Sequence, residues 1–141
     1  MLYSFDLLNK IFDICANDEE LSGLLKIDST LVGNELLDEQ NNKLRREYQT
    51  PEAVMQSDIP FISYYFMHSD KTKTNYLANI GDLYIDIYTN TMYDAGKIAK
   101  RFRRLMADEI DMLMVYEGQH YSAVQGIYKY RLIYNPLIDG E

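Results

Sequence analysis

The sequence has few of the residues that form the disulfides and metal sites of very small proteins. Its 141 residues include one cysteine, Cys15, so a single chain can form neither a disulfide framework nor a zinc site with several cysteine ligands. Tryptophan is absent, and there are only three prolines and two histidines. A chain of this length buries enough apolar surface to fold as one domain without a metal or a disulfide.

Long apolar runs and basic charge are also scarce. No stretch approaches the roughly 20 apolar residues that cross a bilayer, and the N-terminus lacks the basic start of a signal peptide. We therefore expect a cytosolic product with no membrane contact. The chain has 14 Lys and Arg against 22 Asp and Glu, with a net charge of −8 and a pI near 4.7. This balance disfavours general nucleic-acid binding, which needs a basic surface.

The charges are unevenly distributed along the chain. Residues 1–70 carry 5 basic and 13 acidic side chains, a balance of −8, whereas residues 71–141 carry 9 of each. The basic side chains of the second half gather at residues 97–104. An acidic first half and a local basic cluster suit contact between unlike patches, although a merely soluble protein can show the same asymmetry.

Hydrophobic periodicity predicts helices first and strands later. Helical spacing predicts a helix over residues 4–16 and a shorter one that Asp18 caps. Residues 28–49 show only fragmentary helical periodicity. Residues 61–68 are aromatic and favour a strand, and residues 81–88 alternate between apolar and polar side chains. This alternation predicts a strand with one face buried and one face exposed.

The clearest helix is expected over residues 95–108, with Asp94 as its cap. Its apolar side chains recur at helical spacing on a single stripe: Ala95, Ile98, Ala99, Phe102, Leu105 and Met106. Residues 112–116 and 125–134 predict two more strands. The order predicts an α+β fold with a mainly antiparallel sheet of about four to five strands, one long helix packed on a face and additional N-terminal helices. We expect one domain, 1–141, with an acidic helical part (1–57) and a β-β-α-β-β core (58–136).

Candidates for catalysis are few. His120 and Glu117 form only a weak pair, and no nucleophile elbow or phosphate-binding glycine loop is present. Cys15 lies on an apolar helix stripe, where a thiol is buried and inert. Asp82 and Asp86 share a strand face but lie roughly 13 Å apart, too far to share a metal. We therefore expect no enzyme activity, no metal and no cofactor.

The basic cluster at 97–104 has three interpretations. It could be a solvated helix face, a contact with the acidic first half of a neighbouring copy, or a contact with DNA. Phe102 belongs to the apolar stripe and is therefore unavailable to stack on bases.

Tyrosine is unusually frequent, with 13 residues. Tyr84 and Tyr88 share one strand face, and Tyr128, Tyr130 and Tyr134 share another. If the two faces adjoin, they form a tyrosine-rich surface, which either binds a protein or is covered by the N-terminal helices.

The order of elements is similar to that of a known family. It runs from Asp58-Ile59-Pro60-Phe61-Ile62-Ser63-Tyr64 through a hairpin to Gly81-Asp82-Leu83-Tyr84-Ile85-Asp86-Ile87-Tyr88. The helix with Ile98-Ala99-Lys100-Arg101-Phe102-Arg103-Arg104-Leu105-Met106 and closing strands follow. Over residues 50–134 this order resembles the tail-completion or tail-terminator (head–tail joining) proteins of long-tailed bacteriophages. Residues 21–49 depart from the pattern, because this stretch is longer and more acidic than expected between the first helix and the first strand.

The resemblance implies a structural subunit of a virion tail or neck, made in the cytoplasm of the bacterial host. Copies would form a ring, commonly of six, that caps the tail tube and joins it to the head connector. Its partners would be itself, the tail tube protein and a connector or neck protein, while DNA would pass through the lumen without sequence-specific binding. The alternative is a small acidic regulatory or decoy protein that binds a host factor as a monomer or dimer.

The ring interpretation predicts which side chains meet between copies. Basic side chains of the hairpin loop and the long helix would pair with carboxylates in the first half of the next copy. The basic set is Lys71, Lys73, Lys100, Arg101 and Arg104, and the acidic set is Glu19, Glu20, Glu35 and Asp38.

Overall fold

The computed structural model describes residues 4–68, 81–110, 112–120 and 122–136, and it confirms the predicted α+β class. Within these ranges, five strands form one sheet in the order β1-β2-β3-β5-β4. The β1–β2 pair is parallel and the others are antiparallel. The helices are α1 (Ser4–Ala16), α2 (Glu19–Leu24), α3 (Gly33–Lys43) and α4 (Met92–Glu109). The strands are β1 (Leu44–Arg45), β2 (Phe61–His68), β3 (Gly81–Thr89), β4 (Leu113–His120) and β5 (Tyr128–Asn135).

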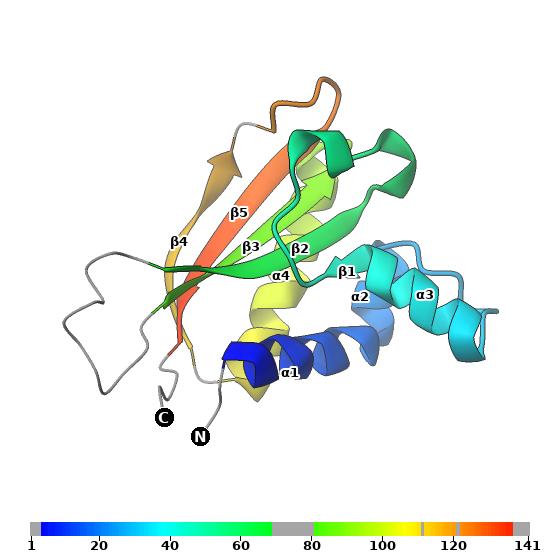
Figure 1. Cartoon of the computed structure of the whole chain (residues 1–141), viewed down its shortest axis with the longest axis horizontal. Coiled ribbons are helices and arrows are strands. Elements are labelled where there is room, and N and C mark those ends of the chain that lie inside the picture. Colours follow the sequence, from blue (N-terminus) through cyan, green and yellow to red (C-terminus); the bar gives the residue numbers. More distant parts are fainter. Residues whose placement is uncertain (1–3, 69–80, 111, 121, 137–141) are drawn as a thin grey trace.

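Helix α4 runs behind the sheet and packs on β3 and β5 (Figure 1). Its buried side chains are the predicted stripe: Ala95, Ile98, Ala99, Phe102, Leu105 and Met106. The predicted cap was wrong. The helix begins at Met92, and the Thr91 hydroxyl accepts a hydrogen bond from the Asp94 amide at 3.2 Å. Asp94 instead lies in the first turn, where its charge favours the helix dipole.

Helices α1 and α2 cover the same side of the sheet as α4. Leu7, Ile11 and Cys15 are buried on α1 at a spacing of four, and Leu8 is half-buried. The predicted cap of α2 is confirmed, because Asp18 Oδ2 accepts a hydrogen bond from the Leu21 amide at 2.9 Å.

Helix α3 occupies the segment whose periodicity was only fragmentary. It packs beside β1 and β2, and the residue that it buries is a lysine, Lys43. The Lys43 ammonium donates to the carbonyl oxygens of Asp58 and Pro60 at 2.8 and 3.1 Å. An apolar pattern is weak here because polar contacts hold much of the inner side of this helix.

The two tyrosine sets lie on opposite faces of the sheet, which contradicts the shared tyrosine surface considered above. Tyr130 pairs with Ile87, on the face that the helices cover, whereas Tyr84 pairs with Ile133, on the other face. The register pairs even-numbered residues of β3 with odd-numbered residues of β5. Side chains alternate between faces, so this register separates the even-numbered tyrosines of the two strands.

The predicted exposed face of β3 is also largely buried. Asp86 is 0% exposed and Tyr88 is 2% exposed. Tyr88 stacks on Phe61 and joins a second, smaller apolar cluster with Val54 and Ile59, both from the segment before β2. The connection between β1 and β2 therefore covers one end of this face.

Strand β4 forms one edge of the sheet (Figure 1) and is longer than predicted. It extends to His120, beyond the predicted end at residue 116, and its register shifts between Met114 and Tyr116. Leu113, Val115 and Tyr116 are exposed along this edge.

Candidate interaction surface

The outward face of α4 is defined here as the side opposite its buried stripe. It carries exposed basic side chains together with two small residues, Gly96 and Ala107. The basic residues on it are Lys97, Lys100, Arg103 and Arg104. Some basic side chains of α4 bind partners in their own chain and stabilise the fold. Others have no such partner among the described residues and remain available to contact another molecule.

Arg101 ties α4 to α2 within one chain. Its Nε and Nη2 donate to the two carboxylate oxygens of Asp18 at 2.8 and 2.5 Å, and Nη1 lies 3.1 Å from a Glu20 oxygen. The hydrogen bond to Arg101 lowers the pKa of Asp18, and the same bond raises the pKa of Arg101. Arg101 and Glu20 were predicted to pair between copies, whereas here each has a partner in its own chain.

Arg103 and Lys97 also have neighbours within the chain. Arg103 Nη1 donates to Glu117 at 2.8 Å, and the Tyr130 hydroxyl donates to the other Glu117 oxygen at 2.9 Å. Burial and this hydrogen bond raise the pKa of Tyr130 to about 12. The Lys97 ammonium lies 4.2 Å from the centre of the Tyr93 ring.

Lys100 and Arg104 differ from the other basic residues of α4. Both are exposed, and among the described residues neither has an ion-pair or cation–π partner. They line two grooves at once. One, of about 360 Å³, lies toward α2 and includes Leu24, and the other, of about 510 Å³, lies toward β4 and β5. The larger groove has apolar lining from Ala107, Met112, Met114 and Tyr134, and Asp108 adds one carboxylate to its basic side chains.

The predicted acidic partners lie elsewhere in the chain. Glu35 and Asp38 are exposed on α3, and within the described ranges they too have no ion-pair partner. Leu37, beside Asp38, is 46% exposed. Glu19 is exposed at the start of α2. The remaining predicted contact residues, Lys71 and Lys73, lie outside the described residues.

A buried cluster of charges links three strands on the face away from the helices. Arg131 Nε and Nη2 donate to the two Asp86 carboxylate oxygens at 2.7 and 3.2 Å. The Tyr65 hydroxyl donates to Asp86 at 2.6 Å, and the Lys129 ammonium lies 3.7 Å away. Sequence reasoning placed Asp86 on an exposed face. The sequence does hold a signal for this cluster. Arg131 on β5 has the opposite charge to Asp86 on β3, and the two residues are direct partners in the sheet.

Burial governs the titration of this cluster. It raises the pKa of Tyr65, which the hydrogen bond to Asp86 raises further, and it lowers the pKa of Lys129. His120 Nδ1 lies 3.4 Å from Arg131 Nη1, and burial followed by the charges of Arg131 and Lys129 lowers the pKa of His120. These groups satisfy one another, so the cluster cross-links the sheet.

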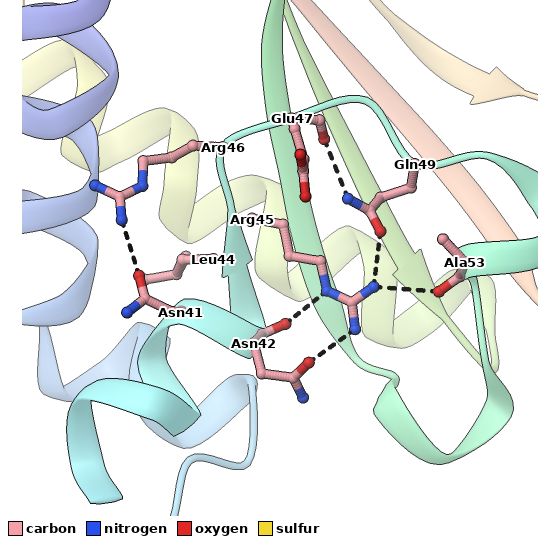
Figure 2. Close-up of a pocket in the computed structure, with 8 residues that line it drawn as sticks. All are labelled: Asn41, Asn42, Leu44, Arg45, Arg46, Glu47, Gln49 and Ala53. Carbon is pink, nitrogen blue, oxygen red and sulfur yellow. Dashed lines mark hydrogen bonds between the residues drawn. The ribbon is translucent and has the colours of Figure 1, made fainter. Parts of the chain in front are cut away.

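A polar hollow of about 550 Å³ surrounds Arg45 and Arg46 between α3 and β2 (Figure 2). Arg45 donates to the Asn42 carbonyl and to Gln49 at 2.8 Å, and it lies 3.0 Å from Asp58. Arg46 donates to Asn41 at 2.8 Å. Both guanidinium groups thus bind partners within the chain, and these contacts hold the connection between α3 and β2 in place.

The thiol of Cys15 is part of the apolar core. Cys15 is 1% exposed, and burial raises its pKa, which opposes formation of the reactive thiolate. Among the residues that the structure describes, no three His, Cys, Asp or Glu side chains are grouped to hold a metal ion. No helix in those ranges combines the length and apolarity needed to span a bilayer.

Comparison with known proteins gives a likeness of fold. No family model matches the chain, and no curated protein matches it. The chain is similar to a solved structure described as the virion of a native gene transfer agent particle, with a TM-score of 0.59 and 12% sequence identity. The match covers 95% of this chain and 95% of the chain in that particle. The whole fold is therefore shared with a virion component.

Proposed function

We propose that this chain is a structural protein of a phage or phage-like particle, without catalytic activity. The observation that carries the proposal is the fold likeness to a chain of a gene transfer agent virion, which extends over 95% of both chains. The outward face of α4 and the acidic helix α3 add unlike charged patches, as expected for a subunit that assembles.

Within that class, we propose a ring-forming tail terminator or completion protein. The ring would cap the tail tube and join it to the head connector, and DNA would pass through it. The resemblance of residues 50–134 to that family supports this role. An acidic chain with net charge −8 is also consistent with a lumen through which DNA slides without sticking.

The test of the virion role is native mass spectrometry of the purified chain over a range of concentrations, followed by electron microscopy. We expect a closed species of about six copies with a central hole. Added to the polymerising tail tube protein from the same phage or prophage, it should bind one tube end and shorten the tubes. A stable monomer or dimer that leaves tube length unchanged would favour the regulatory or decoy protein instead.

A further inference from the structure

We infer that α3 of one copy docks on the outward face of α4 in the next copy, where Glu35 and Asp38 pair with Lys100 and Arg104. This inference rests on the proposed ring-forming function and names the contact that builds the ring. The occupant is thus a second copy of this chain, which the two helices match in charge, spacing, apolar surface and position in the fold.

The charges on the two helices complement each other. Lys100 and Arg104 are exposed cations, and Glu35 and Asp38 are exposed anions, each without an ion-pair partner among the described residues. The other charged groups considered for the contact, Arg101 and Glu20, already pair with each other in one chain. Of the predicted contact residues on these two helices, those that stay unpaired among the described residues are therefore cations on α4 and anions on α3.

The spacing of the two pairs also matches. Lys100 and Arg104 are four residues apart, and Glu35 and Asp38 are three apart, so each pair lies on one face of its helix. Side chains at these separations have Cβ atoms roughly 5–6 Å apart. Two helices lying side by side can thus form both ion pairs at once.

Apolar and small side chains accompany the charges on both helices. Leu37 is 46% exposed beside Asp38, and the groove next to Arg104 has an apolar lining that includes Met112 and Met114. Gly96, one turn before Lys100, is exposed, and a Cβ built there meets nothing within 4 Å. Packing within the chain does not require this glycine, whereas a helix from a neighbouring copy could approach closely there.

The position of the two helices makes the contact head-to-tail. Helix α3 stands beside β1 and β2, and α4 lies behind β3 and β5 (Figure 1). A contact between two different patches leaves one of each available on the next copy, so it builds a closed ring or an open filament, whereas a symmetric dimer needs one patch to meet itself.

The test exchanges the charges between two variants. One variant carries Lys100→Glu and Arg104→Glu, and the other carries Glu35→Lys and Asp38→Lys. Each variant alone brings like charges together, so we expect the concentration for half-assembly to rise by about tenfold or more. In an equimolar mixture of the two variants, a ring in which they alternate has opposite charges at every contact. A chain that carries all four substitutions has opposite charges at the contact between its own copies. Lys10→Glu with Lys26→Glu is the control for the first variant, because it too replaces two cations with two anions.

Native mass spectrometry gives distinct outcomes. Loss of assembly in each variant, with rescue in the mixture at an even copy number and an unaffected control, supports the contact. Wild-type assembly that neither charge exchange weakens overturns this contact but leaves the proposed ring intact. Rescue in open chains of many lengths supports the contact and contradicts the closed ring. A wild-type chain that stays monomeric up to millimolar concentration overturns both.

Discussion

Two groups of charged residues in this molecule differ in where their partners lie. Asp86 and Lys129 are buried on the sheet, Arg131 is half-buried, and the three satisfy one another. Lys100 and Arg104 stand exposed on α4 and have no ion-pair partner within the described ranges. The first group holds the fold together. The second group is exposed, so we expect it to contribute little to the stability of one chain.

The largest expected effect comes from breaking the buried group. Asp86→Ala leaves the buried Lys129 and the half-buried Arg131 without their carboxylate, and we expect the free energy of unfolding to fall by about 3–5 kcal/mol. Urea unfolding measures this loss. Asp82→Ala, on the same face of β3, is the matched control and should change stability by no more than about 0.5 kcal/mol. Equal losses in the two variants would contradict the central role of Asp86.

Removing one hydroxyl from the same cluster should have a smaller effect. Tyr65→Phe deletes the donor to Asp86 at 2.6 Å while it keeps the ring. We expect a loss of about 1.5–3 kcal/mol, as for hydrogen bonds to charged groups. In the Asp86→Ala background the same change should cost much less, because its acceptor is gone. Additive losses in a double-mutant cycle would show that the two side chains do not act together.

Asp18 tests a charged pair that is only partly buried. Asp18→Ala removes the cap of α2, at a cost of about 1 kcal/mol, and it also removes the partner of Arg101. The folded pKa of Asp18 lies below its unfolded value, so its contribution is present above the unfolded pKa of about 3.9 and is lost as the pH falls through the folded pKa.

A second variant, Asp18→Asn, tests this pH dependence. Urea unfolding between pH 2 and pH 7 should show a smaller gain of stability with rising pH in Asp18→Asn than in the wild type. Parallel curves for the two proteins would mean that the Asp18–Arg101 pair contributes nothing to acid sensitivity.

Gly96 should be replaceable within one chain. Gly96→Ala removes the entropic cost of glycine in an exposed helix, and we expect a gain of about 0.5–1 kcal/mol in the free energy of unfolding. Thermal unfolding at a concentration where the chain is monomeric measures this gain. A loss of stability would indicate that the backbone of α4 needs glycine at this position.

The smallest effect on stability is expected at the exposed basic pair. Lys100→Ala with Arg104→Ala should change the free energy of unfolding of the monomer by less than about 0.5 kcal/mol, because neither side chain is buried. The same variant should assemble less well at low salt, where exposed charges are least screened. A large loss of monomer stability would place both side chains with the structural group.

The sequence predicted α4 best, because its stripe from Ala95 to Met106 depends only on spacing within one element. It did not predict how the strands face one another. Whether Tyr84 and Tyr130 share a face depends on the register between β3 and β5, which no single strand encodes. The Asp86 cluster was missed for the same reason, since Arg131 lies 45 residues away. Arg101 was assigned to the surface contact because its partner Asp18, the cap of α2, lies 83 residues away in the sequence.

The most direct test of the contact between copies is disulfide cross-linking of single-cysteine chains. In a Cys15→Ala background, Glu35→Cys is placed on one chain and Arg104→Cys on another, and an equimolar mixture is oxidised under mild conditions. We predict rapid formation of a covalent dimer that contains one chain of each kind, whereas Lys10→Cys in place of Arg104→Cys should give little. Equal cross-linking with both partners, or none with either, would contradict the account.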